Sequence, residues 1–124
     1  MLAGSPVLQG MFGAGQALVS AIKLTELPGV NIEETPKDTT YIHLLFDQHE
    51  VIFANAAPTE SLFLGEQALG SVGARARAEI LMIFPELGRQ GFAPLPAAPI
   101  LSNKDQKALV SQHRDSKSPI SNLA

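Results

Sequence analysis

Two histidines and a carboxylate lie within seven positions of one another, and they are the residues of this sequence best suited to acid–base chemistry. His43, Asp47 and His49 belong to a stretch that begins at Tyr41 with the sequence Tyr-Ile-His-Leu-Leu-Phe-Asp-Gln-His-Glu. A histidine titrates near neutral pH, so His49 can pass a proton at a scissile peptide bond. Asp47, two residues earlier, is the candidate to orient the His49 ring.

Each histidine also has a structural interpretation. At the end of an expected turn, His49 would be satisfied by a hydrogen bond to Asp47 or Glu50, as most such polar groups are. His43 lies within an expected strand, where alternation already explains a polar side chain. His113 lies near the end of an expected helix, where a partial positive charge is favourable. Because the chain offers no evident nucleophile, the structural interpretation of His49 stays open beside the catalytic one.

The sequence supports a metal site or a nucleophile less well than it supports a proton-transferring histidine. His43, Asp47 and His49 are metal-binding residue types, but zinc needs converging ligands, and side chains that alternate along a strand and turn need not converge. The sequence has no cysteine, which excludes disulfides, thiolate metal sites and a cysteine nucleophile. No Gly-x-Ser-x-Gly surrounds Glu60-Ser61 to make that serine a nucleophile. We therefore predict neither a bound metal nor a cofactor.

The elements that would position these residues are mostly predicted strands. A β-branched and aromatic run at 39–46, the polar pair Asp47-Gln48 and a second run at 50–54 together predict a hairpin. Leu27-Pro-Gly-Val30 predicts a turn, because proline presets the second turn position and glycine accepts a positive φ. Further strands are expected at 7–11 (or a loose arm there), at 16–24, where the composition does not exclude a helix, and at 61–64.

Two helices are predicted in the second half of the chain. Good helix formers fill 73–84, and Pro85 ends that helix because it disfavours the α conformation at the residue before it. A second helix is expected to start at Ser102, whose hydroxyl can cap free amides, with Asp105 near the positive end of the helix dipole. It would end near His113, before a polar and frayed tail.

The composition is that of a packed protein with many turns. The 124 residues are 45% hydrophobic and include nine prolines and ten glycines, which favours short elements over a helix bundle. We predict a mainly β fold class with two C-terminal α-helices. Residues 1–92, with the first helix, would form one domain, and 93–124 would form a loop, the second helix and the frayed tail.

The stretch from Tyr41 to Asn55, followed by Glu60-Ser61, resembles the C-terminal histidine-bearing motif of Hint domains, the self-processing domains shared by hedgehog proteins and inteins. It is similar to bacterial Hint-domain proteins in particular. Further similar segments occur in the same order at Met11-Phe-Gly13, 17–24 and 76–87. The resemblance implies that His49 is an assisting histidine at a cleavage or splice junction, and that residues 1–92 are a partial Hint-like β domain.

The resemblance also implies that parts of the family's machinery are missing. An intact Hint domain begins with a Cys or Ser nucleophile and carries a Thr-x-x-His motif further on, and we expect both to be absent here. Ser5-Pro6 is a candidate remnant of a Ser-Pro-x-His-Arg segment, although no His-Arg follows it. Asn55 is internal, so asparagine cyclisation is not assigned to it. We therefore expect the C-terminal portion of an autoprocessing domain, inactive alone, which an N-terminal Hint fragment would complete.

The alternative is a non-enzymatic binding or assembly module. Half a domain leaves strand edges and apolar faces uncovered, and self-association would cover them. The candidate residues for that surface are Leu62, Leu64, Phe84 and Phe92. The net charge of −3, with acids and bases interspersed, gives no footprint for nucleic acid or for an anionic membrane. No signal peptide or membrane-spanning run is apparent, so the compartment stays open.

Overall fold

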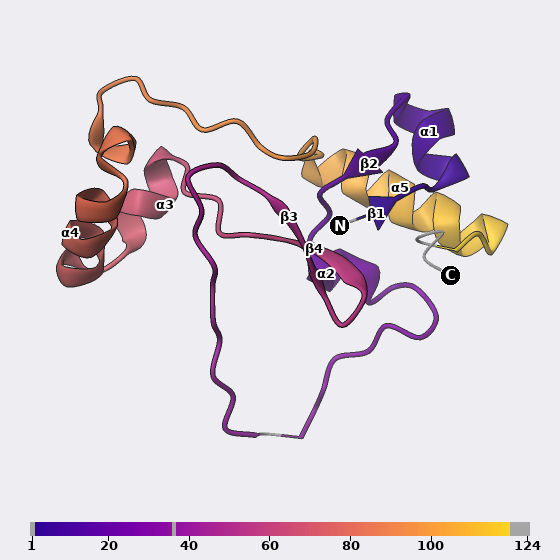
Figure 1. The fold of residues 1–124 in the computed structure, drawn as a ribbon. Coiled ribbons are helices and arrows are strands. Elements are labelled where there is room, and N and C mark those ends of the chain that lie inside the picture. Colours follow the sequence, from indigo (N-terminus) through magenta and orange to yellow (C-terminus); the bar gives the residue numbers. More distant parts are fainter. Residues whose placement is uncertain (1, 36, 120–124) are drawn as a thin grey trace. The chain divides into compact units, whose positions relative to one another are not determined.

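The computed structural model describes residues 2–35 and 37–119, and the chain divides into two compact units (Figure 1). The terminal unit comprises the described parts of 1–41, 53–59 and 98–124, so segments from both halves of the chain contribute to it. The central unit comprises 42–52 and 60–97. The predicted domains 1–92 and 93–124 stay a prediction beside this division.

In the terminal unit, short elements from the start of the chain pack with one long helix. These elements are β1 (Leu2–Ala3), α1 (Pro6–Phe12), β2 (Gln16–Ala17), α2 (Ala21–Leu24) and α5 (Asn103–Ser116). Strands β1 and β2 pair antiparallel, and Leu18 pairs in parallel with Ile100. Helices α1 and α2 both contact α5. Helix α5 is therefore the element against which the early part of the chain packs.

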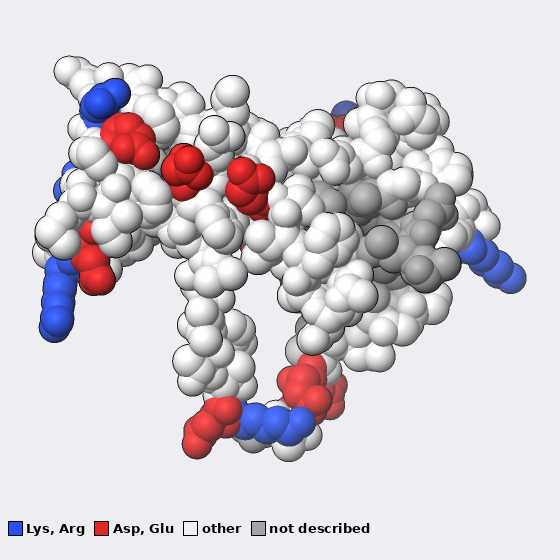
Figure 2. All heavy atoms as spheres, in the orientation of Figure 1, with Lys and Arg blue, Asp and Glu red and all other residues white. Residues whose placement is uncertain are grey.

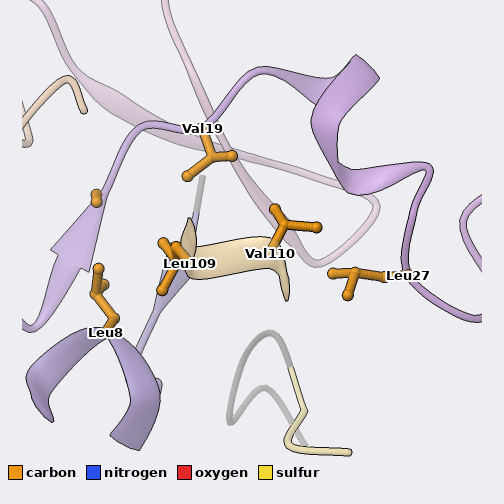
Figure 3. Close-up of a cluster of buried hydrophobic side chains, with 6 residues drawn as sticks. Leu8, Val19, Leu27, Leu109 and Val110 are labelled. Atoms are coloured by element: carbon orange, nitrogen blue, oxygen red, sulfur yellow. The ribbon is translucent and has the colours of Figure 1, made fainter. Parts of the chain in front are cut away.

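Six buried apolar side chains form the core of the terminal unit (Figure 3). They are Leu8, Ala17, Val19, Leu27, Leu109 and Val110. In Figure 3, Leu109 of α5 lies beside Leu8 of α1, whereas Val110 lies on the side of Leu27. Consecutive residues of one helix thus bury two different parts of the early chain, and burial of apolar surface is the main favourable term in folding.

Helix α1 replaces the strand or loose arm predicted at 7–11, and that prediction is wrong. The Ser5 hydroxyl accepts a hydrogen bond from the Leu8 backbone N–H (3.1 Å), and Pro6 occupies the first turn. Gly13 ends the helix with a φ of +63°, which glycine adopts without a Cβ penalty. A serine cap, a proline at the start and a glycine at the end together define a helix boundary on both sides.

The strand predicted at 16–24 is correct only at its beginning. Strand β2 covers Gln16–Ala17, and the chain enters α2 at Ala21. Between them, the Ser20 backbone N–H donates to Oε1 of Gln106 (3.0 Å), a residue of α5. Because that bond joins residues far apart in sequence, local composition could not indicate where the strand ends.

The predicted turn at 27–30 is confirmed. The Val30 N–H donates to the Leu27 carbonyl (3.3 Å), Pro28 takes the second position and Gly29 has a φ of +83°. A positive φ at the third position is the mark of a type II turn, for which glycine is preferred. The turn places Leu27 in the core of the terminal unit.

A two-stranded hairpin is formed by β3 (Val51–Ala54) and β4 (Ala57–Glu60). The predicted strand within 50–54 is confirmed, but its predicted partner at 39–46 is wrong, because that segment forms no strand. Asn55 and Ala56 both have positive φ, 51° and 63°, as a tight two-residue hairpin turn requires. This turn brings the chain straight back to Ala57, so the nearer segment fills the ladder of β3.

Three short helical elements shape the central unit: α3 (Glu66–Ser71), α4 (Ala74–Ile83) and the 3-10 helix η1 (Pro85–Gly88). The helix predicted at 73–84 is therefore confirmed to within one residue at each end. The strand predicted at 61–64 is wrong, since these residues are in no regular element. Pro85 ends α4 as expected and then opens η1, because proline is tolerated in the first turn of a helix.

The start of the second predicted helix is also confirmed. The Ser102 hydroxyl accepts from the Asp105 N–H (3.1 Å) and donates to Oδ2 of Asp105 (2.7 Å). Helix α5 runs to Ser116, three residues beyond the predicted end, and Lys117 closes it with a φ of +53°. Residues 120–124 of the predicted frayed tail lie outside the described residues.

The mainly β fold class is wrong. The structure is 38% helical and 11% strand, and its strands form two-stranded sheets. The error has a local cause. Short apolar runs are ambiguous between strand and buried helix. At Val7 the Ser5 cap and Pro6 favour the helix, whereas the short helix at Ile22 forms without a side-chain cap.

Candidate functional site

His49 is the centre of the candidate site and lies in the central unit, two residues before the start of β3. Its side chain is only 1% exposed. The ring of Phe63 lies against the His49 ring, with centroids 4.7 Å apart and an interplanar angle of 39°. The Ala97 backbone N–H donates to Nδ1 of His49 (3.1 Å). The imidazole is therefore held on one face by an aromatic ring and at one nitrogen by the main chain.

The bond from Ala97 determines the tautomer of His49. A backbone N–H can only donate, so Nδ1 must be the unprotonated acceptor. In the neutral ring the proton is then on Nε2, which lies 3.1 Å from Oε2 of Glu60. That approach is within ion-pair distance but outside hydrogen-bond geometry, so buried Nε2 makes no hydrogen bond within the described residues. A rotation of the half-exposed Glu60 carboxylate would complete the bond.

Glu60 is the carboxylate partner that sequence reasoning missed. It is the last residue of β4, and the hairpin returns it to His49. The next residue, Ser61, holds this register: its N–H donates to the Glu50 carbonyl (2.9 Å), and its buried hydroxyl accepts from the Glu50 N–H (2.9 Å). Glu60-Ser61 stands at the end of the sequence motif. Whether Glu60 comes close to His49 depends on the hairpin register, which the residue pattern did not specify.

Asp47 has a different surrounding from the one predicted. It is exposed, and no hydrogen bond or ion pair between Asp47 and His49 occurs in the described part of the chain. The role of Asp47 in orienting His49 stays a prediction. The carboxylate that lies near the His49 ring in the structure is that of Glu60. Glu50, the other predicted partner of His49, uses its backbone to bind Ser61.

His43 is exposed on the extended segment before His49. The described residues contain no group of three or more His, Asp or Glu side chains placed to hold a metal ion. The letters Thr40-Tyr-Ile-His43 have the Thr-x-x-His spacing, so the expected absence of that spacing from the chain was wrong. Both Thr40 and His43 are exposed.

His113 belongs to a second buried polar pair, in the terminal unit. Its Nε2 lies 2.8 Å from the Ser5 hydroxyl, and its Nδ1 lies 3.2 Å from the Ser118 carbonyl. Because a carbonyl only accepts, Nδ1 carries the proton and Nε2 accepts from Ser5. Ser5 and His113 are 2% and 1% exposed. This pair ties the cap of α1 to α5, a role beyond the favourable helix-end charge that the sequence predicted for His113.

An open hollow of about 440 Å³ adjoins His49. Its walls come from two short stretches of the central unit, 47–49 and 92–97.

Acidic and basic side chains are interspersed on the face shown in Figure 2, where no continuous cationic area is visible. Among the described residues, no helix has the length and apolar character needed to cross a membrane.

Comparison with known proteins identifies the family of the chain. A family model described as Hint domain matches residues 1–66, which is more than half of the 124 residues and includes His49 and Glu60. No curated protein and no solved structure matches the chain. The chain therefore belongs to the Hint-domain family of autoprocessing-type domains.

Proposed function

We propose that this chain is the C-terminal, histidine-bearing portion of a Hint autoprocessing domain, in which His49 assists cleavage and Glu60 is its charge partner. The observation that carries the proposal is the 3.1 Å approach of Nε2 of His49 to Oε2 of Glu60, around a ring that is otherwise buried. A carboxylate at one nitrogen of an imidazole can orient the ring and leave the other nitrogen for proton transfer, as in catalytic triads.

The chemistry assigned to His49 is proton transfer at a peptide bond. In a reaction of this family, a nucleophile adds to the preceding carbonyl carbon, the C–N bond breaks, and the released amine takes a proton. A protonated His49 would supply that proton from Nδ1, and Glu60, at Nε2, would stabilise the imidazolium before the transfer. This assignment makes Glu60 a positioning residue, because it acts through His49.

We assign the nucleophile of this reaction to a segment outside the sequence described here. The chain has no cysteine. Its two buried serines near the elements of interest, Ser5 and Ser61, are only 2% and 3% exposed, so neither is accessible to a peptide bond in this structure. An N-terminal Hint fragment, or residues encoded upstream in the same reading frame, would supply the missing group. Alone, the chain is expected to be inactive.

The test is a comparison of the chain with and without the segment encoded upstream in frame. We expect the chain alone to keep its mass in the presence of dithiothreitol or hydroxylamine, and the longer protein to cleave itself. His49→Ala should slow that cleavage by about 100-fold, the usual contribution of a general acid or base. Glu60→Gln should slow it less and change its pH profile. Product formation is followed by mass spectrometry.

Gln112→Ala is the control for this test, since Gln112 is exposed on α5, and it should cleave at the unaltered rate. The proposal fails if the chain alone cleaves itself or if His49→Ala cleaves as fast as the unaltered longer protein. A stop codon or an unrelated sequence upstream would also overturn it, in favour of assembly.

A second candidate function is self-association, supported by apolar side chains on the extended segment of the central unit. Ile42 and Leu44 are 79% and 51% exposed and lie in a stretch that forms no helix or strand. The segment is bound through the Leu44 carbonyl, which accepts from the Leu62 N–H (2.7 Å). Exposed apolar residues beside an extended backbone are typical of sites where a second strand adds.

The residues named for assembly from the sequence are placed differently. Leu64 is buried, with 5% exposure, and Phe92 is 37% exposed, while Leu62 and Phe84 are half-buried. Leu64 is therefore not available to a partner in this structure, and Ile42 and Leu44 are the better candidates.

Light scattering over a range of protein concentrations tests the assembly function. If a second copy covers Ile42, the mean mass should rise with concentration, and Ile42→Lys should return it to the monomer value because a charge opposes burial. Met82→Lys is the matched control, since Met82 is also 79% exposed but lies on α4. A monomer at every concentration, or equal effects of the two substitutions, would contradict self-association through this segment.

A further inference from the structure

Residues 92–97, here called the strap, are bound to His49 although they lie beyond the residues that match the family. The family match ends at residue 66. The strap ends at Ala97, whose N–H donates to Nδ1 of His49 (3.1 Å). The His49 side chain is 1% exposed in this arrangement. The strap, which lies outside the family match, therefore binds Nδ1 of His49, a residue inside the family match.

Occupation of Nδ1 limits what His49 can do. While the Ala97 N–H points at Nδ1, a proton cannot be placed there, because two donors would face each other. The ring is then restricted to the neutral Nε2–H form. A general acid must gain a proton and give it up again, so His49 can donate a hydrogen bond in this state but cannot complete a proton-transfer cycle.

We propose that the strap is an intrachain cap that holds His49 inactive, and that its release frees Nδ1 to take up a proton. The imidazolium then has protons on both nitrogens and faces the carboxylate of Glu60 through Nε2. This inference rests on the proposed function of His49, which it extends by a means of control. The strap contact itself is a property of the chain alone and is measured separately.

The strap has features that favour its release from His49 without unfolding of the central unit. It contains no helix or strand, and Pro94 and Pro96 have no N–H groups with which to bind neighbouring backbone. The hollow of about 440 Å³ between the strap and residues 47–49 shows that the two are not closely packed along their length. Leu95 is 85% exposed and contributes little burial. The Ala97 bond is then the main polar contact to break.

Chemical modification of the three histidines by diethyl pyrocarbonate, located by peptide mass spectrometry, tests the cap on the unaltered full chain. Exposed His43 is the reference for a free imidazole, and His113, 1% exposed, is the reference for a buried one. We expect His49 to react at least about tenfold more slowly than His43, because a protected group reacts only when the chain opens locally.

Ala97→Pro removes the N–H that binds Nδ1 and should raise the modification rate of His49 by about fivefold or more. Ala93→Pro makes the same change at a strap residue whose N–H forms no hydrogen bond among the described residues, and it should leave the rate within about twofold. Hydrogen exchange of the α4 amides shows whether the central unit remains folded in each variant. If Ala97→Pro loses that protection, lactic acid in place of Ala97, which turns the Pro96–Ala97 amide into an ester without an N–H, serves instead.

Either of two results overturns the cap. One is a His49 that reacts as fast as His43 in the unaltered chain. The other is a His49 that stays protected in a folded variant lacking the Ala97 N–H. Neither result depends on self-cleavage. A failure of His49→Ala to slow processing would remove the proposed function and leave the measured protection intact, so the two failures are distinguishable.

Discussion

Replacing Leu109 by alanine is expected to lower the free energy of unfolding of the terminal unit by about 3 kcal/mol. Leu109 is completely buried and belongs to the six-residue core in which α5 meets the early part of the chain. The substitution removes apolar contacts and leaves a cavity that the surrounding side chains fill only in part. Because α5 is the element that α1 and α2 both contact, the loss should affect the whole terminal unit.

Urea unfolding followed by circular dichroism measures this effect. Ile22→Ala is the control in the same unit, because Ile22 is 58% exposed and most of its surface is already in water; its cost should stay below about 1 kcal/mol. Equal destabilisation by the two substitutions would mean that the core is not centred on α5.

Replacing Ser5 by alanine is expected to cost about 2–4 kcal/mol, because one hydroxyl performs two tasks. It caps α1 by accepting from the Leu8 N–H, and it donates to buried Nε2 of His113. Loss of a cap costs about 1 kcal/mol, and a buried acceptor left without its donor costs a further 1–3 kcal/mol or so. The same urea titration compares Ser5→Ala with Ser102→Ala, the exposed serine cap of α5, which should lose only about 1 kcal/mol.

A double substitution separates the two contributions of Ser5. In Ser5→Ala with His113→Leu, no unpaired Nε2 remains, so the combined cost should be less than the sum of the single costs. Strict additivity, or a Ser5→Ala effect no larger than that of Ser102→Ala, would show that the Ser5–His113 bond contributes nothing to stability.

Local signals in the sequence were sufficient wherever one residue and its near neighbours set the backbone. The capping serine at 102, the proline at 85 and the Pro-Gly pair at 28–29 gave the right start of α5, the right end of α4 and the right turn, because each acts on backbone within four positions of itself. The residue pattern around His49 likewise led to the correct family.

The same kind of reasoning failed where the partner of a segment had to be chosen. The run at 39–46 has the composition of a strand, yet β3 pairs with β4, because the positive φ angles at Asn55 and Ala56 return the chain at once. Strand propensity describes a suitable surface and does not specify which segment will lie beside it. The mainly β prediction failed for this reason and because short apolar runs near Ser5 and Ser20 became helices.

The amino-acid sequence by itself determined the family, the two longer helices and His49 as the residue of interest. Only the tertiary structure decided what surrounds that histidine: Glu60 as its carboxylate neighbour, where Asp47 was predicted, and Ala97 on its other nitrogen, 48 positions further along the chain. A side chain's type is local information and shows what it can bind. Its partners depend on hairpin register and on contacts between distant segments, and these exist only once the chain has folded.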